Sequence, residues 1–252
     1  MLKMSGPHAL VSLRGVGKTY PAGVTALRGV DLDIRAGEFL TLLGPSGCGK
    51  STILRLIAGL DRVSAGELIR RFEDVGAAIG FVFQEPTLMP WGSVFDNVFL
   101  PLRLRGMTRR SAAPAVDEAL ALVGLAGFHK AYPRELSGGM RMRVSIARAL
   151  VLRPRLLLMD EPFAALDEIA RFQLNDDLLR LKDETGATVV FVTHSIYESA
   201  YLSTRVAVMA SGPGRIVTEI TNDAPREGSR DSAAFAALCQ QVSEALRQAK
   251  KE

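Results

Sequence analysis

Nine consecutive residues have the types and spacing of a phosphate-binding loop. The pattern is G-x-x-x-x-G-K-S-T, and its members are Gly44, Pro45, Ser46, Gly47, Cys48, Gly49, Lys50, Ser51 and Thr52. Glycines let backbone N–H groups surround anionic oxygens, and a helix that begins at the loop directs further N–H groups toward them. Lys50 is then placed for the terminal phosphates and Ser51 for a Mg²⁺ ion. The loop predicts binding of a nucleoside triphosphate.

The loop needs a strand before it and a helix after it, and its flanking residues predict both. Residues 39–43 are apolar, and residues 53–60 carry apolar side chains at helical spacing. This strand–loop–helix context distinguishes a phosphate loop from an ordinary glycine-rich turn.

A pair of acids follows the apolar run at residues 156–159. Asp160 and Glu161 stand where a buried strand would end, at the carboxyl edge of a parallel sheet, which is where ligands bind in such folds. Phosphoryl transfer needs charge neutralisation and an oriented nucleophile. We therefore expect Asp160 to accept from water on Mg²⁺ and Glu161 to polarise the attacking water.

A second anion-binding helix start is predicted further along the chain. Ser137, Gly138 and Gly139 offer a hydroxyl, bare backbone N–H groups and the positive end of the helix that follows. Two such helix starts in one chain separate it from other proteins with a phosphate loop.

Strands and helices alternate along the chain, which predicts an α/β fold. The runs at 156–159 and 188–192 are apolar without alternation, as in parallel strands buried on both faces. Residues 93–125 are expected to be an inserted helical block, broken at Pro101 and Pro114.

Length, composition and net charge limit which classes of protein the chain can belong to. With 252 residues and 48% hydrophobic content, the chain can bury a sizeable core in one large or two small domains. No apolar run approaches the ~20 residues that span a bilayer, and the N-terminus lacks the apolar segment of a secretory signal. Two cysteines, Cys48 and Cys239, favour a reducing cytosolic compartment. The net charge of +4 is small and dispersed, so no nucleic-acid partner is predicted.

Together these motifs resemble the nucleotide-binding subunits of ATP-binding cassette (ABC) transporters, from about Val11 to Ile220. The resemblance implies an α/β fold with a P-loop NTPase (RecA-like) core, an N-terminal antiparallel β subdomain and an inserted α-helical subdomain. Residues 44–52 resemble Walker A, residues 156–160 resemble Walker B, and residues 136–140 resemble the family signature.

Further residues match single positions of that family. Gln84 resembles the Q-loop glutamine, which contacts Mg²⁺ and senses the transmembrane partner. Asp167 resembles the D-loop aspartate, His194 the switch histidine that contacts the γ-phosphate, and Tyr20 the aromatic ring that stacks on adenine. The implied catalytic residues are Glu161, His194 and Gln84, and the implied Mg²⁺ ligands beside ATP are Ser51, Gln84 and Asp160.

The resemblance also implies an assembly. ATP on Walker A of one copy is closed over by Ser137, Gly138 and Gly139 of a second copy, and closure moves separate transmembrane permease subunits. A solute-binding protein acts indirectly, and the chain lies peripherally on the cytoplasmic face of the inner (plasma) membrane. The ATP-binding domain is expected over residues 9–230, with a helical subdomain at about 87–150, and a C-terminal helix over 231–252.

Three segments resemble the nitrate/sulfonate/taurine branch of bacterial importers, namely Gln84–Trp91, Asn97-Val98 followed by Pro101-Leu102, and Gly214–Val217. That branch imports small organic or inorganic anions and some pyrimidine precursors, and residues 86–107 are implied to receive the coupling helix of the permease. Four features depart from the branch: a short stretch at 67–83, Met142 in place of glutamine, Ala164 in place of serine, and Ser195 in place of aspartate. No primary catalytic group is removed, but the solute stays unassigned.

Three other interpretations are weaker. A soluble ABC ATPase that acts on nucleic acid or ribosomes usually carries a coiled-coil or zinc insertion, or a second cassette, and the sequence contains none of these. A P-loop kinase leaves the glycine pair after Ser137 and the histidine at 194 unexplained. A purely regulatory nucleotide-binding protein would lack the catalytic base, yet Glu161 is present.

Overall fold

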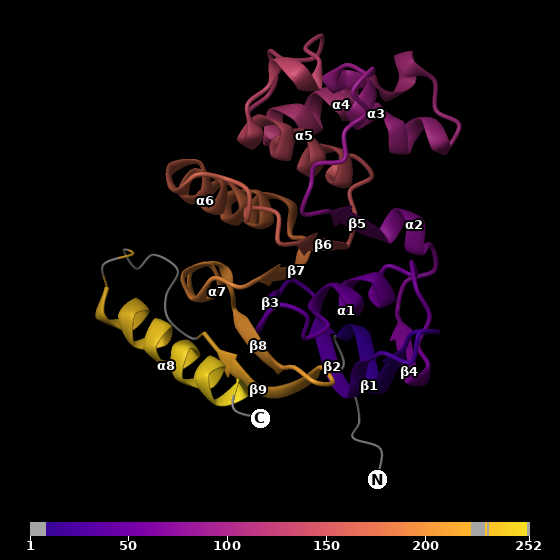
Figure 1. Cartoon of the computed structure of the whole chain (residues 1–252). Coiled ribbons are helices and arrows are strands. Elements are labelled where there is room, and N and C mark those ends of the chain that lie inside the picture. The colour runs from indigo at the N-terminus through magenta and orange to yellow at the C-terminus, as the bar shows by residue number, and fades with distance from the viewer. Residues whose placement is uncertain (1–8, 223–229, 231, 251–252) are drawn as a thin grey trace. The chain divides into compact units, whose positions relative to one another are not determined.

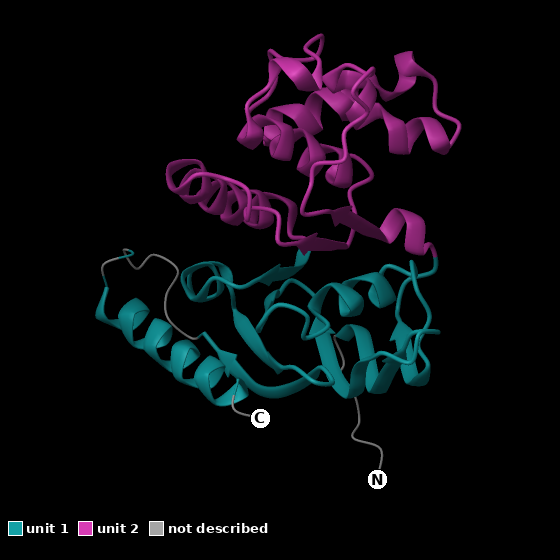
Figure 2. Cartoon of the chain, viewed as in Figure 1, with its two compact units in different colours: residues 1–73, 188–252 teal, residues 74–187 magenta. Residues whose placement is uncertain are grey.

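A computed structural model of the chain describes residues 9–222, 230 and 232–250, which group into two compact units (Figure 2). Unit 1 holds the chain up to Glu73 and from Thr188 onward, and unit 2 holds Asp74–Ala187. Figure 1 shows the order of the elements along the chain. Throughout the described ranges, every helix is too short or too polar to cross a membrane.

An antiparallel sheet forms the N-terminal part of unit 1. Strand β1 (Ala9–Thr19) lies between β2 (Thr25–Arg35) and β4 (Ala65–Arg70) and pairs with both in antiparallel fashion. In β2, Leu32 and Ile34 are buried, and the acids beside them are less so. This is the antiparallel β subdomain that the resemblance implies.

The second sheet of unit 1 carries the phosphate loop. Strand β3 (Phe39–Leu43) lies between β7 (Thr188–Thr193) and β8 (Arg205–Ala210) and runs parallel to both, and β9 (Arg215–Thr221) pairs antiparallel with β8. Every residue of β3, β7 and β8 is buried. Full burial explains why these strands are apolar without alternation.

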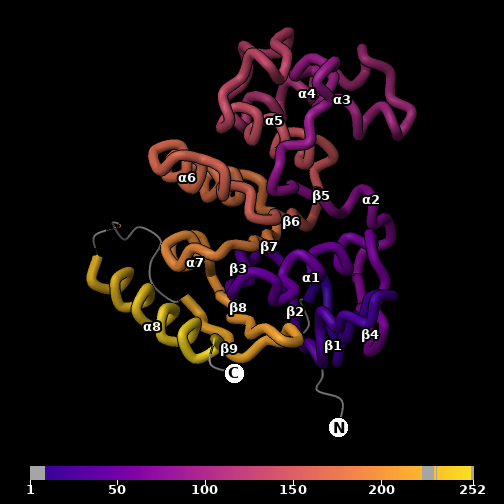
Figure 3. Tube along the Cα trace, in the orientation of Figure 1, coloured from indigo at the N-terminus to yellow at the C-terminus, as the bar shows by residue number. Residues whose placement is uncertain are grey.

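Helices complete unit 1. Helix α1 (Lys50–Ile57) contacts β7, and α7 (Ile196–Leu202) contacts β3. Helix α8 (Ala233–Ala249) lies along β8 and β9 and contacts α7 (Figure 3). Its buried face belongs to one apolar cluster with α7, β3, β8 and β9. Of the expected domain ranges, residues 223–229, 231 and 251–252 lie outside the described residues.

Unit 2 contains a parallel strand pair and its flanking helices. Strands β5 (Ile79–Val82) and β6 (Leu156–Asp160) pair in parallel, and β6 contains the apolar run at residues 156–159 that predicted a buried parallel strand. The short α2 (Val75–Ala78) contacts β5, and α6 (Glu168–Thr185) follows the acidic end of β6.

The inserted block of unit 2 consists of three packed helices. They are α3 (Val94–Leu104), α4 (Arg109–Leu122) and α5 (Gly138–Leu150), with a 3₁₀ turn at Pro133–Glu135 between the last two. These elements, together with the α/β pattern of both units, agree with the expected fold class.

The expected breaks at Pro101 and Pro114 are wrong, because both prolines lie inside helices, in α3 and α4 respectively. The chain turns instead at Gly106, whose φ of +81° belongs to the left-handed region that glycine tolerates. Thr108 then caps α4 by accepting a hydrogen bond from the Ser111 N–H. The break between α3 and α4 is therefore set by Gly106 and Thr108, which lie between the helices, and not by the prolines within them.

Candidate functional site

The phosphate loop of unit 1 is shaped by glycines that no larger residue can replace. A Cβ at Gly44 would lie 2.7 Å from the carbonyl oxygen of Met209 and 2.8 Å from the Cys48 Sγ. Gly49, the N-cap of α1, has φ +92°, and a Cβ there would lie 2.5 Å from Leu27 Cδ2. The loop therefore closes tightly at both ends, which is the shape that backbone N–H groups need in order to surround a phosphate.

Lys50 is buried and held against the loop. Its ammonium donates to the carbonyl oxygens of Gly44, at 2.8 Å, and Pro45, at 3.0 Å. Cys48 is also fully buried, with its Sγ 3.9 Å from the Lys50 Nζ. The sulfur thus packs under the loop, while the positive charge is kept at the loop, where phosphates are expected.

Parallel pairing brings the predicted switch histidine to the same sheet edge as the phosphate loop. Leu43, the last residue of β3, is in register with Thr193, the last residue of β7. The next residues along the two strands are Gly44 and His194. They start adjacent loops at the carboxyl edge, where ligands bind in open parallel sheets.

Tyr20, the predicted adenine-stacking residue, has one ring face and its hydroxyl already engaged. The ammonium of Lys18 lies 4.9 Å from the ring centroid, and the Tyr20 hydroxyl lies 3.4 Å from the Thr52 Oγ1 in α1. Lys18 also donates to Asp61 at 2.5 Å and to the Arg62 carbonyl oxygen at 2.9 Å. The hydrogen bond from Lys18 holds the pKa of the Asp61 carboxyl below its usual 3.8. The ring is therefore seated beside the phosphate loop.

In unit 2, the acids that end β6 include a backbone outlier. Asp160 is the last residue of the strand, and Glu161 follows with φ +45°. A residue other than glycine in this region costs about 1–3 kcal/mol, and such residues cluster at functional sites. The strained backbone makes Glu161 stand out among the acids of this unit as a functional candidate.

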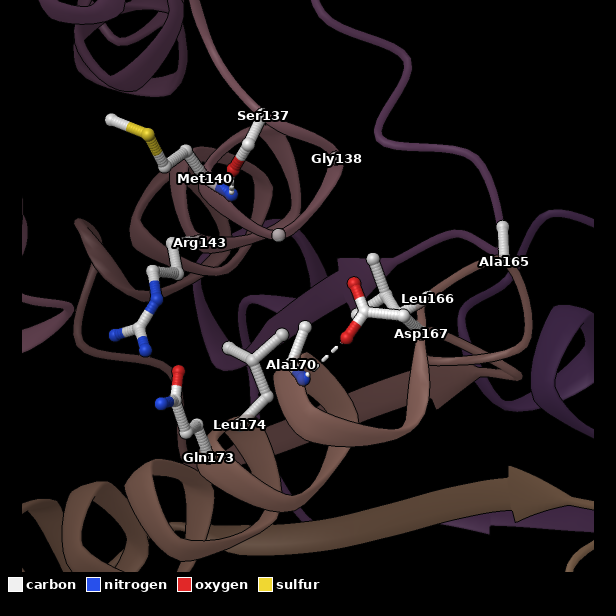
Figure 4. A pocket seen from close by; sticks show the side chains of 11 residues that line it. Ser137, Gly138, Met140, Arg143, Ala165, Leu166, Asp167, Ala170, Gln173 and Leu174 are labelled. Carbon is white, nitrogen blue, oxygen red and sulfur yellow. Dashed lines mark hydrogen bonds between the residues drawn. The ribbon is translucent and has the colours of Figure 1, made fainter.

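The signature segment and the D-loop border one cavity of about 360 Å³ in unit 2 (Figure 4). Ser137 is the N-cap of α5 and accepts from the Met140 N–H at 3.2 Å, and Asp167 is the N-cap of α6 and accepts from the Ala170 N–H at 2.9 Å. The cavity therefore opens between two helix N-termini. The side chains or backbone that line it belong to Ser137, Gly138, Gly139, Met140, Arg143, Ala165, Leu166, Asp167, Ala170, Gln173 and Leu174.

Gln84 is exposed in the turn after β5, and the residues that follow it are held by the signature helix. Arg148 of α5 donates to the carbonyl oxygens of Pro86, at 2.8 Å, and Thr87, at 2.9 Å. Thr87 has φ +46°. Burial lowers the pKa of the Arg148 guanidinium from its ordinary value. The segment after Gln84 and the signature helix are thus tied by the half-buried guanidinium of Arg148.

The donors present suit ATP with Mg²⁺. The described residues contain no group of three or more His, Cys, Asp or Glu side chains arranged to hold a metal. Mg²⁺ bound with a nucleotide is usually held by one or two protein oxygens together with phosphates and water. The Ser51 hydroxyl, the Asp160 carboxylate and the Gln84 amide oxygen are hard oxygen donors of that kind.

The structure therefore places the predicted residues in two groups, one in each unit. Unit 1 brings together the phosphate loop, Tyr20 and His194, and unit 2 brings together Ser137, Gly138, Gly139 and Asp167 at one cavity. Unit 2 also holds Gln84, Asp160 and Glu161.

Comparison with known proteins decides the family. A family profile described as ABC transporter matches residues 27–164, which is more than half of the chain. The chain belongs to the ABC transporter family. Relatives of this cassette include an aliphatic sulfonates import ATP-binding protein from Bacillus cereus, 41% identical over 92% of this chain and 94% of the relative. A taurine import ATP-binding protein from Rhizobium johnstonii is 48% identical over 81% of this chain and 79% of the relative.

A solved structure gives the same result for the fold. The dimeric structure of an ATP-binding cassette in a post-hydrolysis state, bound to ADP and Pi, matches this cassette with a TM-score of 0.71. The match has 36% identity and covers 87% of this chain and 100% of that chain. The α/β P-loop NTPase fold is thus confirmed, and this ABC cassette is an ATPase coupled to transport.

Two departures from the importer branch have local physical reasons in this cassette. Ser195 caps α7 by accepting from the Glu198 N–H at 3.2 Å, and serine and aspartate are comparable N-caps. Met142 is buried in α5 and does not line the cavity, whereas Met140 does. Ser195 therefore keeps the start of α7 capped, and Met142 lies outside the residues that line the cavity.

Sequence reasoning missed Lys18, Arg148 and Glu198. Lys18 contacts the Tyr20 ring, Arg148 donates to the backbone just after Gln84, and Glu198 accepts from Thr193, the residue before His194. Lys18 is two residues before Tyr20, but its anchor Asp61 is far along the chain. Only the spacing of Glu198, four residues after His194, offered a signal in the sequence.

Proposed function

We propose that this chain is the ATP-hydrolysing subunit of an importer for small anions such as sulfonates or nitrate, and that it drives a separate transmembrane permease. The observation that carries the proposal is 41% and 48% identity, over most of the chain, to subunits named for aliphatic sulfonate and taurine import. The match of Gln84–Trp91 to the same branch supports it. A subunit that drives a permease works peripherally at the cytoplasmic face of the inner membrane.

On the nucleotide side, unit 1 supplies the binding groups. Tyr20 stacks on adenine with the ring face that Lys18 leaves open. The backbone N–H groups of residues 44–52 surround the phosphates, and Lys50 directs its ammonium at the terminal ones. The Ser51 hydroxyl at the start of α1 holds Mg²⁺.

Hydrolysis needs an oriented water and stabilised charge. Bound Mg²⁺ neutralises charge that develops on the phosphate oxygens. Asp160 and Gln84 take up the oxygen-donor positions for this ion, while Glu161 orients the attacking water and accepts its proton. His194 contacts the γ-phosphate from the edge shared with Gly44.

The complete site needs two copies of the chain. Ser137, Gly138 and Gly139 of one copy close over the nucleotide held by the other, and Asp167 lies at the same cavity. The dimeric form of the similar cassette supports this arrangement. ATP binding can drive closure of the dimer, and so move the permease, only if ATP binds the closed state more tightly than the open one.

The helical subdomain at about 87–150, within an ATP-binding domain over 9–230, receives the permease. Within the proposed docking segment at 86–107, Trp91 and Leu104 are 78% and 79% exposed. Large exposed apolar side chains mark interaction surfaces. A solute-binding protein delivers the anion to the permease and contacts this chain only indirectly.

The first prediction tests the catalytic assignment. Glu161→Gln removes the proton acceptor but keeps its shape, so we expect ATP turnover to fall about 10²-fold or more, with ATP affinity retained and the closed dimer favoured. Phosphate release and gel filtration with ATP measure these effects. Glu184→Gln, at an exposed position, is the matched control and should hydrolyse normally. Wild-type turnover in Glu161→Gln would remove Glu161 from the mechanism.

The solute class is tested in the assembled transporter. ATPase activity of the complex with its permease should rise when the binding protein carries a small sulfonate or nitrate, and should not rise with a neutral sugar. Stimulation by the sugar alone would contradict the anion assignment while leaving the ATPase assignment in place.

A further inference from the structure

The loop that carries His194 is fixed by hydrogen bonds on both sides of the histidine. His194 itself is exposed, whereas Thr193 and Glu198 are 3% and 5% exposed. The Thr193 hydroxyl donates to the Glu198 carboxylate, and the same hydroxyl accepts from the Ser195 N–H at 3.0 Å. The Thr193 hydroxyl therefore holds both residues next to His194, because it belongs to the residue before it and accepts a hydrogen bond from the residue after it.

These hydrogen bonds also connect Thr193 to the first turn of α7. Ser195 caps α7 by accepting from the Glu198 N–H, and Glu198 projects its carboxylate back to Thr193. The segment from Thr193 to Glu198 is thus a closed ring of hydrogen bonds, and His194 is the exposed residue within it. On its other side, Thr193 pairs with Leu43 at the start of the phosphate loop.

A buried carboxylate is an expensive way to hold a loop. Removing a charged or polar group from water costs several kcal/mol unless hydrogen bonds compensate it, and an apolar residue would fill the same volume without that cost. The buried Glu198 carboxylate lies one helical turn from His194, the residue proposed to contact the γ-phosphate. A positioning role for Glu198 would explain why a charged group occupies this place despite the cost.

We propose that Glu198 is a positioning residue for His194, acting through the Thr193 hydroxyl. This inference rests on the proposed role of His194 at the γ-phosphate. Glu198 sets the direction in which His194 leaves the sheet edge beside Gly44. Because a misplacement of about 1 Å at a reacting centre can cost 10²-fold in rate, small movements of this loop change turnover more than binding.

The test compares turnover, affinity and stability in the full chain. We expect Glu198→Ala to lower kcat at least tenfold, about 1.4 kcal/mol of activation free energy, with the Kd for ATP within twofold of wild type. Glu198→Gln keeps an oxygen that accepts from Thr193 and should recover most of kcat. Thr193→Val should behave like Glu198→Ala, and Thr193→Ser like wild type.

A matched control separates positioning from folding. Glu38 is also a buried carboxylate, 9% exposed and paired with Arg205, but it precedes β3 at the opposite end from the phosphate loop. Glu38→Ala should lower the melting temperature without lowering the kcat of the folded protein. An equal loss of kcat in Glu38→Ala and Glu198→Ala would overturn the positioning role.

The decisive measurement is a double-mutant cycle with His194→Ala. If Glu198 acts through His194, adding Glu198→Ala to His194→Ala causes no further loss of kcat. The same tenfold loss in both backgrounds overturns the inference, and so does wild-type turnover in Glu198→Ala. Full activity in His194→Ala overturns the proposed role of His194 and this inference with it, whereas the Glu161→Gln test of the ATPase assignment is unaffected.

Discussion

Single residues in this cassette act through partners that are distant in sequence. Tyr20 matches a family position, but its ring is seated by Lys18, and Lys18 is in turn fixed by Asp61. The Lys18 side chain is only 10% exposed, so its contacts with the ring and with Asp61 are shielded from most of the solvent. One face of the ring is thereby occupied by Lys18, and the proposed stacking of adenine would use the other face.

Lys18→Met tests this seat. The substitution keeps a long apolar side chain but removes the charge over the ring, and a cation–π contact is worth about 0.5–1 kcal/mol or more. We expect the Kd for ATP to rise about threefold, with kcat at saturating ATP unchanged. Isothermal titration of ATP measures the effect, and Lys130→Met, at an exposed position, is the control. An unchanged Kd would show that Tyr20 needs no support from Lys18.

Residues with a fixed spacing to their neighbours in sequence could be predicted, and residues defined by packing could not. The loop from Gly44 to Thr52, the acids Asp160 and Glu161 at the end of β6, and Ser137 at the start of α5 each have a fixed position relative to the element that they begin or end. Arg148 meets Thr87 across about sixty positions of sequence, and no local pattern announces that contact. The left-handed backbone of Glu161 is equally invisible, because glutamate gives no hint of a positive φ.

At the scale of elements, the contact between α5 and the Q-loop links two functional segments. Arg148 anchors Pro86 and Thr87, which follow Gln84, while the same helix begins at Ser137. We propose that a displacement of the Q-loop by the permease would be transmitted through Arg148 and along α5 to the signature end.

Arg148→Met tests this link. The methionine fills part of the volume but cannot donate to the two carbonyl oxygens, so the Q-loop is released from α5. We expect basal ATPase activity of the isolated cassette to change by less than about threefold, and stimulation by the permease complex to fall at least fivefold, consistent with coupling energies of about 1–3 kcal/mol. Arg153→Met, at a side chain 78% exposed, is the control. Undiminished stimulation would exclude the link.

The C-terminal helix is held by packing on unit 1. Its buried residues Leu238 and Val242 join Leu43, Val206 and Val208 in one apolar cluster. The amphipathic pattern of residues 232–250 predicted the helix but not the surface that it covers, because the strands of that surface are separated from it in sequence. Phe235 adds an edge contact to the Tyr197 ring of α7, at 5.2 Å between centroids.

Leu238→Ala measures what this packing contributes. A buried leucine truncated to alanine costs about 2 kcal/mol or more, which corresponds to a fall of roughly 4–8 °C in melting temperature for a chain of this size. Gln240→Ala, on the exposed face of the same helix, should leave the melting temperature unchanged. Equal effects of the two substitutions would show that α8 contributes nothing through its apolar face.

At the scale of the whole molecule, one chain carries one phosphate loop and one signature segment, in different units. The proposed assembly pairs each loop with the signature of the other copy. If sites form between copies, the ATPase activity of a dimer with two inactivating substitutions depends on whether the substitutions are on the same copy or on different copies. A site completed within one chain predicts the opposite dependence.

The test uses mixed dimers that carry Lys50→Ala and Ser137→Arg, assembled with two affinity tags. When the substitutions are on different copies, closure between copies leaves one intact site, made from the loop of the Ser137→Arg copy and the signature of the Lys50→Ala copy. When both substitutions are on the same copy, no site is intact. We therefore expect at least tenfold more ATP hydrolysis in the first arrangement than in the second. A site completed within one chain requires the opposite order, because the unsubstituted copy would then keep a whole site of its own.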